Sequence, residues 1–342
     1  MTPSALQPQV TSVEPLFACE GGRVTIRGRD LWTGEGPPRL RLGDVAVRVS
    51  AASATTLTFR VPGETGGGPM PIRVESDADL GFLEIARPVA TGLHQVDSPA
   101  FDRDGRLYVT YSGSRGQQVP VSIFRVERSG ARESFSSTIV NPTAMVIGPD
   151  GDLYVSSRFE GNVYRVGPDG TAKVFATELG VPCGLTFSPQ GVLFVGDRSG
   201  TIFRLRKDGQ PLMVATLPSS VAAFHLAFGP DGWIYVTAPT LTSYDRIYRV
   251  NPDGRTEVAY SGFGRPQGLA FDAQGVLHVV EALAGSSGLY RVGADDEPQL
   301  VVSGEGLVGV AFDPVGGLVL SSNDTVYRFD TQPAPAAATA GE

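Results

Sequence analysis

The feature that most constrains this chain is a segment of about 40 residues that occurs six times in succession after residue 97. Each copy contains an apolar run, a glycine-containing turn and a second apolar run, as in TAMVIGPDGDLYV and QGLAFDAQGVLHV. Such a repeat buries its apolar faces by packing against its neighbours, so the copies are expected to form one unit. The turn glycines are Gly105, Gly151, Gly191, Gly232, Gly275 and Gly316.

Each copy is predicted to form four short strands. After the glycine turn comes a second series of apolar runs, from IFRV (123–126) to VYRF (326–329), and several copies add a third, such as VFAT (174–177). Asp-Gly and Ser-Gly pairs between the runs suit tight turns, because glycine accepts positive φ. No amphipathic helix pattern interrupts the series. Four strands per repeat of this length are typical of a β-propeller blade, and six copies predict an all-β, six-bladed propeller.

The last copy lacks its fourth strand. The chain continues after residue 330 as TQPAPAAATAGE, which we expect to be a disordered tail over 331–342. The segment PVAT (88–91) precedes the first copy and matches the outer-strand runs of the others. We therefore predict that it supplies the missing strand and closes the ring, which would remove the open sheet edges. The propeller is placed at 87–330.

Residues 8–86 do not follow this period. They contain about seven short apolar or alternating runs separated by turn-forming residues. Arg23, Thr25 and Arg27 alternate with apolar residues, which is the pattern of a half-buried antiparallel strand. The segment predicts a small immunoglobulin-like β-sandwich without the paired cysteines of antibody domains.

Both regions resemble known families. The stretches PQVTSVEPLFACEGGRVTIRGRDL and VRVSAASATTLTFRVP resemble the IPT/TIG domain, which has an immunoglobulin-like fold. The repeats, with PQGLAFDAQGVLHV as an example, resemble the NHL and regucalcin/gluconolactonase (SMP-30) group of six-bladed propellers. That resemblance implies a fold rather than an activity, because such propellers include lactonases, lyases and binding proteins.

Composition excludes several functions. The net charge of −8 argues against sequence-independent binding of nucleic acid or of an anionic membrane. The chain has no apolar stretch long enough to span a bilayer, and MTPSALQPQV lacks the features of a secretory signal, so we expect a cytoplasmic protein. Cys19 and Cys183 are too few for a disulfide framework or a zinc site.

The candidate site lies on one face of the propeller. The loops between the second and third strands vary in length, with insertions at 111–122, 238–246 and 281–288, and variable loops on a rigid scaffold commonly bind ligands. Tolerated surface decoration is the alternative. Residues at the start of first strands and the end of second strands should meet these loops around the central channel. The predicted ligand-binding residues are Asp97, Tyr111, Arg115, Arg158, Glu160, Asp197, Arg198, Tyr244, Arg265 and Gln267.

The family resemblance implies a metal site at the channel mouth, but this chain differs from the family at the ligand positions. Regucalcin-like lactonases bind a divalent cation through Glu, Asn and Asp at the channel mouth. The matching positions here hold Asp97, Phe224 and Gln267, and neither of the last two suits a hard cation. A replacement set for Ca²⁺ or Zn²⁺ would be Asp97, Asp197 and Glu281; the alternative is that these are solvated rim carboxylates. No other cofactor is predicted.

His225 departs most clearly from the repeat, because its equivalents in other copies are Ala or Gly. It is either a channel-facing base, with Glu281 as catalytic partner, or a packed core histidine. His278 replaces an aromatic residue of the second strand, and a packing role is favoured for it and for Cys183. The arginine that follows the aromatic residue of each third strand recurs in every copy, which indicates an architectural role with the guanidinium paired.

Three functions remain open. The first is a binding protein that holds a small polar ligand or a protein partner at the rim. The second is a metal-dependent lactonase-like hydrolase, and the third is a lyase with His225 as acid–base. The first ranks highest, because two of the three family metal ligands are absent.

Overall fold

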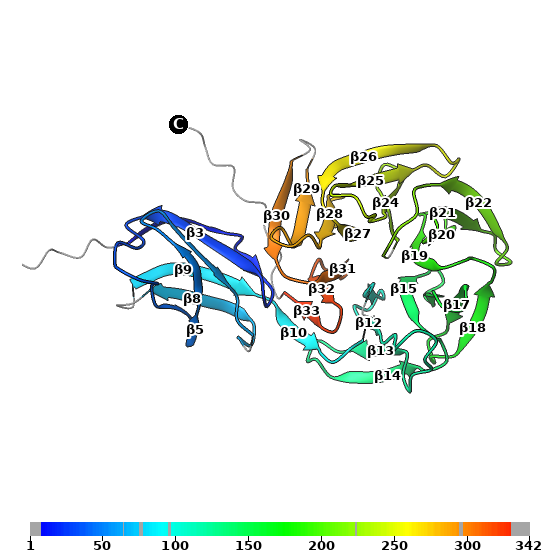
Figure 1. The fold of residues 1–342 in the computed structure, drawn as a ribbon. Coiled ribbons are helices and arrows are strands. Elements are labelled where there is room, and N and C mark those ends of the chain that lie inside the picture. Colours follow the sequence, from blue (N-terminus) through cyan, green and yellow to red (C-terminus); the bar gives the residue numbers. More distant parts are fainter. Residues whose placement is uncertain are drawn as a thin grey trace, which may run out of the picture.

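A computed structural model describes residues 8–63, 65–74, 78–94, 97–222, 224–293 and 297–329. These residues form strands and loops without a helix, so none of them provides an apolar helix that could cross a membrane. The sheets form a ring around a central axis, and a smaller β-sandwich lies beside the ring (Figure 1). The all-β prediction of a sandwich followed by a propeller is confirmed.

The ring contains six four-stranded antiparallel units, which are the blades. Blade one contains β11 (Ala100–Phe101), β12 (Leu107–Thr110), β13 (Ile123–Val126) and β14 (Arg132–Ser136). Blade two contains β15 (Pro142–Ile147), β16 (Leu153–Ser157), β17 (Asn162–Val166) and β18 (Ala172–Ala176). Blade three contains β19 (Pro182–Phe187), β20 (Leu193–Asp197), β21 (Thr201–Leu205) and β22 (Pro211–Thr216).

Blade four contains β23 (His225–Phe228), β24 (Ile234–Thr237), β25 (Asp245–Val250) and β26 (Thr256–Phe263). Blade five contains β27 (Pro266–Phe271), β28 (Leu277–Glu281), β29 (Gly288–Val292) and β30 (Pro298–Ser303). Blade six contains β31 (Leu307–Phe312), β32 (Leu318–Ser322) and β33 (Val326–Arg328). The second strands are buried on both faces because neighbouring blades cover them, which explains their continuous apolar runs.

The ring closes as the sequence predicts. The strand β10 (Arg87–Ala90) pairs antiparallel with β33 and becomes the outer strand of blade six. Val89 of β10 is buried in a cluster with Val319 and Val326, which anchors the N-terminal strand in the propeller core. The first and last parts of the propeller are therefore held in one sheet.

The sandwich has more strands than the seven predicted. One sheet has the order β1 (Gln9–Glu14), β3 (Arg23–Arg29), β7 (Thr56–Arg60), β6 (Val49–Ala52). The other sheet contains β9 (Ala78–Ile85), β8 (Gly68–Val74), β4 (Leu40–Leu42) and β5 (Val45–Val47). The run VAVRVSA is divided between the two sheets, because β5 pairs with β4 in one sheet and β6 pairs with β7 in the other. Leu57, Phe59 and Ile72 are fully buried between the sheets.

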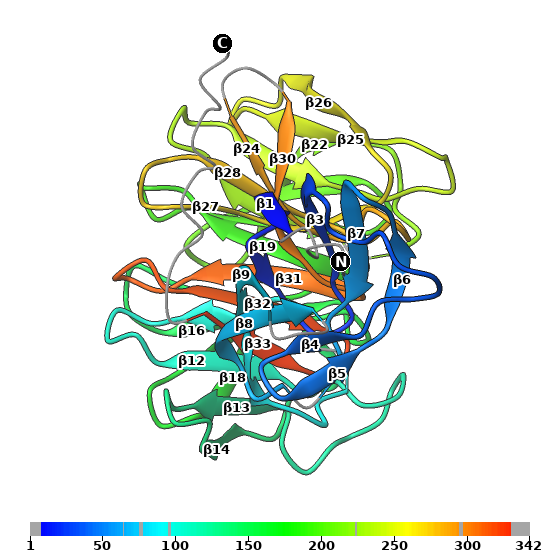
Figure 2. The ribbon, with the colours of Figure 1, turned by 90° about the vertical axis from the view of Figure 1, so that its left-hand side faces the viewer.

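A two-residue strand that the sequence did not reveal joins the two parts. The strand β2 (Phe17–Ala18) pairs in parallel with β30 on one side and with β9 on the other. Blade five and one sheet of the sandwich thereby form a continuous sheet of nine strands. Figure 2 shows the sandwich strands beside β30. The sandwich is thus attached to the side of blade five through β2.

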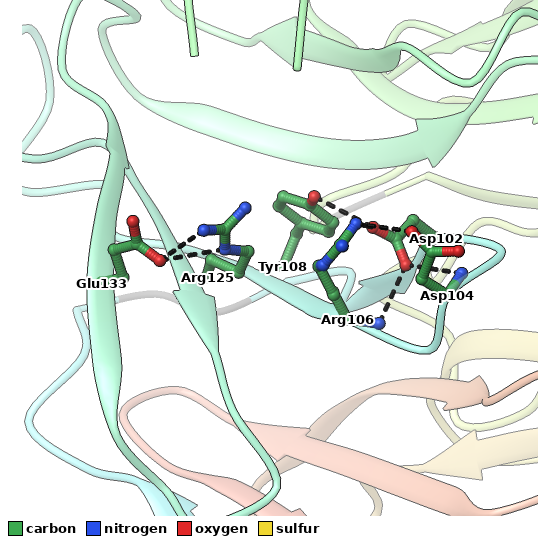
Figure 3. Close-up of polar contacts among 6 residues, drawn as sticks. All are labelled: Asp102, Asp104, Arg106, Tyr108, Arg125 and Glu133. Carbon is green, nitrogen blue, oxygen red and sulfur yellow. Dashed lines mark hydrogen bonds and ion pairs between the residues drawn. The ribbon is translucent and has the colours of Figure 1, made fainter. Parts of the chain in front are cut away.

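Four of the recurring arginines, Arg125, Arg165, Arg249 and Arg328, are paired with carboxylates on the face that carries the tight glycine turns. In blade one, Arg125 donates to Glu133 at 2.5 Å, and the Tyr108 hydroxyl donates to Asp102 at 3.1 Å (Figure 3). In blade two, Arg165 contacts Asp152 at 2.6 Å. These pairs bind strands within one blade, so these arginines are architectural, as predicted from their repetition.

Candidate functional site

The loop-bearing face of the propeller gathers the starts of the first strands around the channel. Close packing of the blades requires glycine there: a Cβ on Gly184, Gly268 or Gly309 would overlap the carbonyl oxygen of a residue in the next blade. For Gly309, that carbonyl belongs to Asp97. The backbone of Asp97 is therefore held against blade six, at the inner edge of the ring.

His225 occupies the equivalent position in blade four and extends toward Asp97 of blade one. The His225 Nε2 and Asp97 Oδ1 atoms lie 3.4 Å apart, and the two side chains are only 5% and 11% exposed. Neither atom makes a hydrogen bond within the part of the chain that the structure describes. Two buried polar atoms without partners are unusual in a folded protein and point to a group that is missing from the chain itself.

Burial dominates the protonation of both groups. It raises the pKa of Asp97, although His225 and Arg158 oppose the shift. Burial likewise lowers the pKa of His225, against the attraction of Asp97. The imidazole is therefore neutral near pH 7, with one nitrogen able to donate and the other to accept a hydrogen bond.

Two arginines and a thiol complete the surroundings of this pair. Arg158 acts electrostatically on Asp97 and on Cys183, and Arg198 acts on Cys183. Arg158 also approaches the Ser112 hydroxyl at 3.4 Å. Cys183 is buried, and burial, the largest cause, raises its pKa to about 12, so the thiol stays protonated and inert as its packing role predicts. We call Asp97, Arg158, Arg198 and His225 the channel-mouth cluster.

A small cavity lies within the channel beside this cluster. It has a volume of about 70 Å³ and is lined by His225, Ser98 and the glycines of neighbouring first strands. That volume suits a few water molecules rather than a ligand.

The other two carboxylates of the predicted metal set are occupied by their own loops. Glu281 accepts backbone N–H groups of Gly264, Arg265 and Leu283 at 2.6, 2.7 and 2.7 Å. Asp197 accepts the backbone N–H of Val181 at 2.7 Å and the Ser199 hydroxyl. Each fixes the loop entering the first strand of its own blade. Glu281, predicted as the catalytic partner of His225, therefore has the environment of a loop-fixing carboxylate.

The donors for a metal ion do not come together. Among the residues that the structure describes, no group of three or more His, Cys, Asp or Glu side chains is placed to hold a cation. Phe224, at a position where the resemblance implies a ligand, is fully buried in the core of blades three and four. The set of Asp97, Asp197 and Glu281 is thus not assembled as a metal centre.

The remaining predicted residues are dispersed over the rim. Tyr111 packs its ring edge-on against Phe124 within blade one, with centroids 6.4 Å apart. Glu160 accepts a hydrogen bond from the Tyr164 hydroxyl at 2.9 Å. Tyr244 is 72% exposed at a loop tip of blade four. Arg115 and Arg265 are exposed in rim loops. Gln267 is buried at the start of β27.

Sequence reasoning missed Asn141, which shapes the rim between blades one and two. It is fully buried with φ of 47°, and its amide nitrogen donates to the carbonyls of Ser112 and Ser114 at 2.6 and 2.9 Å. Its Oδ1 accepts the Gly116 N–H at 2.6 Å. It thereby holds the blade-one loop beside Arg158. An Asn before the proline of β15 was the available signal, because asparagine tolerates a left-handed turn.

His278 has the packing role predicted for it. Its ring lies edge-on to Phe312 with centroids 5.0 Å apart, and Nδ1 is 3.2 Å from the Val276 carbonyl. Burial lowers its pKa, so it stays neutral. His278 belongs to the core near the glycine turns and not to the channel mouth.

Comparison with known proteins identifies the first domain. Residues 8–83 match the IPT/TIG domain family, so this part of the chain is an IPT/TIG domain. The comparison with curated proteins gave no match.

Solved structures resemble the whole architecture at low identity. An auxiliary nutrient binding protein from Bacteroides thetaiotaomicron is 11% identical, with 94% of this chain and 97% of that chain covered and a TM-score of 0.54. A gluconolactonase from Xanthomonas campestris is 15% identical, with 87% and 98% covered and a TM-score of 0.59. A catalytically inactive variant of virginiamycin B lyase from Staphylococcus aureus, solved with quinupristin, is 14% identical, with 72% and 98% covered and a TM-score of 0.52. These likenesses show the fold alone.

Proposed function

We propose that this protein is a binding protein whose channel-mouth cluster holds a small polar ligand. The observation that carries the proposal is the pair of buried, unpartnered atoms, Asp97 Oδ1 and His225 Nε2. A ligand with a hydroxyl or amide group could supply the hydrogen bonds that both atoms lack. Buried polar atoms without partners cost about 1–3 kcal/mol each, and a ligand that pairs them gains that energy on binding.

The charges around the pair suggest the ligand's chemistry. Arg158 and Arg198 bring two positive charges to the mouth, and burial raises the pKa of the nearby Asp97. Arginine binds carboxylate groups through paired hydrogen bonds. A small hydroxy acid, with its carboxylate on the arginines and a hydroxyl on Asp97 and His225, fits this arrangement best.

Binding is favoured over metal-dependent hydrolysis by the state of the other carboxylates. Glu281 and Asp197 are committed to loop amides, so they are not available to hold a cation beside Asp97. The likeness to a nutrient binding protein extends over nearly the whole chain, including the sandwich. It is compatible with binding as the common role of both domains.

A lactonase-like activity is the second candidate, and one observation favours it. The neutral His225 beside Asp97 is a suitable general base to take a proton from water as it attacks a lactone carbonyl. The ring C–O bond would then break, giving a hydroxy acid. The likeness to a gluconolactonase is compatible with this reading. A lyase reaction has only the same histidine in its support.

Isothermal titration of the purified protein with D-gluconate and other small hydroxy acids tests the binding proposal. We expect saturable binding that weakens at least about tenfold in Asp97→Asn and in Arg158→Gln, since each loses a charge-assisted hydrogen bond. Asp104→Asn, in the exposed glycine turn of blade one on the opposite face, is the matched control and should bind normally. Binding that is indifferent to Asp97→Asn would contradict the proposal.

Acid release from D-glucono-1,5-lactone, measured in a pH-stat, distinguishes the lactonase-like activity from ligand binding alone. If the protein only binds ligands, the lactone should hydrolyse at its spontaneous rate whether or not the protein is present. A rate increase that disappears in His225→Ala would favour the hydrolase.

A further inference from the structure

A second site lies between the IPT/TIG domain and the propeller. A cleft of about 860 Å³, here called the interdomain cleft, is bordered on one side by β1, β3 and Arg60 of the sandwich. On the other side are β30 and two loops of blade five, at 285–287 and 304–305. Figure 2 shows β1, β3 and β7 beside β30. The volume lies within the range of ligand-binding clefts, which often form between domains.

Two strand edges border the interdomain cleft. Four consecutive residues of β1, Thr11–Glu14, line it, as do three consecutive residues of β30, at 299–301. Because successive side chains of a strand point to opposite faces, a consecutive run reaches a cleft only where the strand presents its edge. β1 is the terminal strand of its sheet, and β2 pairs only with Val302 and Ser303 of β30. Backbone groups along such edges are open to pairing with another strand.

The lining has an excess of positive charge in a chain of net charge −8. Arg23, Thr25 and Arg27 point from one face of β3 into the cleft, and Arg60 stands opposite Arg23 on β7. Arg27 contacts Glu14 at 3.3 Å, and Arg60 is paired with Glu305. Arg23 has no ion-pair partner among the described residues. The charged lining is therefore three arginines against two glutamates, which favours an anionic ligand.

Apolar side chains lie near these arginines. Leu16 is 55% exposed, Phe17 is half-buried, and Leu300 and Val301 of β30 line the same space. A strand laid along β30 would direct alternate side chains to opposite faces. One set would meet the arginines and the other set would meet these apolar residues.

We propose that the interdomain cleft binds an extended peptide segment with alternating acidic and apolar side chains, which adds as a strand along the free part of β30. Main-chain hydrogen bonds would supply affinity, and a carboxylate on Arg23 would supply specificity. The site is separate from the channel mouth, so either can fail without the other.

The test uses a fluorescein-labelled peptide of alternating Glu and Val, six residues long, in a polarisation titration against the full-length protein. We expect saturable binding at millimolar peptide or below, weakened at least about tenfold by Arg23→Glu. The matched control is Arg73→Glu, because Arg73 is exposed on β8 and stands opposite Arg41 as Arg23 stands opposite Arg60. A Lys–Val peptide should bind Arg23→Glu better than wild type. Thermal unfolding verifies that both variants fold.

Backbone pairing is tested with the same peptide N-methylated at alternate residues, which should bind at least about tenfold more weakly. Hydrogen exchange should slow in β30 upon binding. Four results would each overturn the proposal: no saturable binding to wild type, equal affinity of the N-methylated peptide, equal effects of Arg23→Glu and Arg73→Glu, or loss of binding in Asp97→Asn.

Discussion

Glu281 offers the sharpest test of the difference between a structural carboxylate and a functional one. Its two oxygens accept three backbone N–H groups, from Gly264, Arg265 and Leu283, at 2.6–2.7 Å. The side chain is only 3% exposed overall. Glu281→Ala leaves three donors without an acceptor at the start of blade five. Glu281→Gln keeps one acceptor oxygen and places an amide NH₂ where another acceptor is needed.

The magnitude follows from these three bonds. A buried donor left unpaired costs about 1–3 kcal/mol, and water entering the loop would offset part of the sum. We expect Glu281→Ala to lower the free energy of unfolding by about 3–5 kcal/mol and Glu281→Gln by about 1–3 kcal/mol. For a domain of this size, the larger loss lowers the Tm by roughly 6–20 °C.

The chain provides its own reporter for this measurement. It has two tryptophans, Trp32 in the sandwich and Trp233 in blade four. In a Trp32→Phe background, fluorescence during urea unfolding reports on the propeller alone. Glu160→Gln, on the exposed rim, is the control. If Glu281→Ala unfolds like wild type but loses hydroxy-acid binding, the carboxylate belongs to the ligand site and our structural interpretation is wrong.

Three further perturbations have defined outcomes. The pKa of His225 is lowered in the folded protein, so the unfolded state takes up the proton first as the pH falls, and the wild type loses stability. His225→Gln lacks this loss and should therefore become more stable relative to wild type between pH 7 and 5. Parallel curves of Tm against pH for the two proteins would contradict this. Gly309→Ala should cost about 1–3 kcal/mol in urea unfolding, since its Cβ would overlap the next blade, whereas Gly293→Ala, with open space around it, should be neutral. Val89→Asp puts an unpaired charge into the closing sheet and should cost about 3–5 kcal/mol, with aggregation visible by size-exclusion chromatography; a monomer of wild-type stability would refute the role of β10.

The sequence predicts the propeller well because its signal is local and repeated. Each blade needs the same alternation of apolar runs and glycine turns, so six copies support one another. Ring closure by β10 was also predictable, since the missing outer strand left a gap that one matching segment could fill. The strand β2 was not predictable. Two residues, Phe17 and Ala18, carry no periodicity, and their pairing depends on where β30 and β9 lie in space.

The sequence predicted where the candidate site residues lie on the propeller, but it did not predict their hydrogen-bond partners. Asp97, Asp197 and Glu281 all lie at the rim, as their places in the repeat require. What separates them is the direction of nearby backbone N–H groups, which fixes Asp197 and Glu281 to their loops and leaves an oxygen of Asp97 without a partner. Loop geometry of this kind depends on turn conformation rather than on residue type, so the three carboxylates look alike in sequence.

His225 shows how one departure from the repeat can create a site. The small residues at this position in other blades face the carbonyl of the next blade, and an imidazole has no room there. In blade four, the corresponding carbonyl, of Gln267, instead accepts the Thr237 hydroxyl at 2.5 Å. The contact between blades is therefore maintained by β24. The imidazole of His225 extends toward Asp97. Its Nε2 lies near Asp97 Oδ1 without forming a hydrogen bond. This pair of buried atoms without partners in the chain is the basis of our proposal that the cluster binds a ligand.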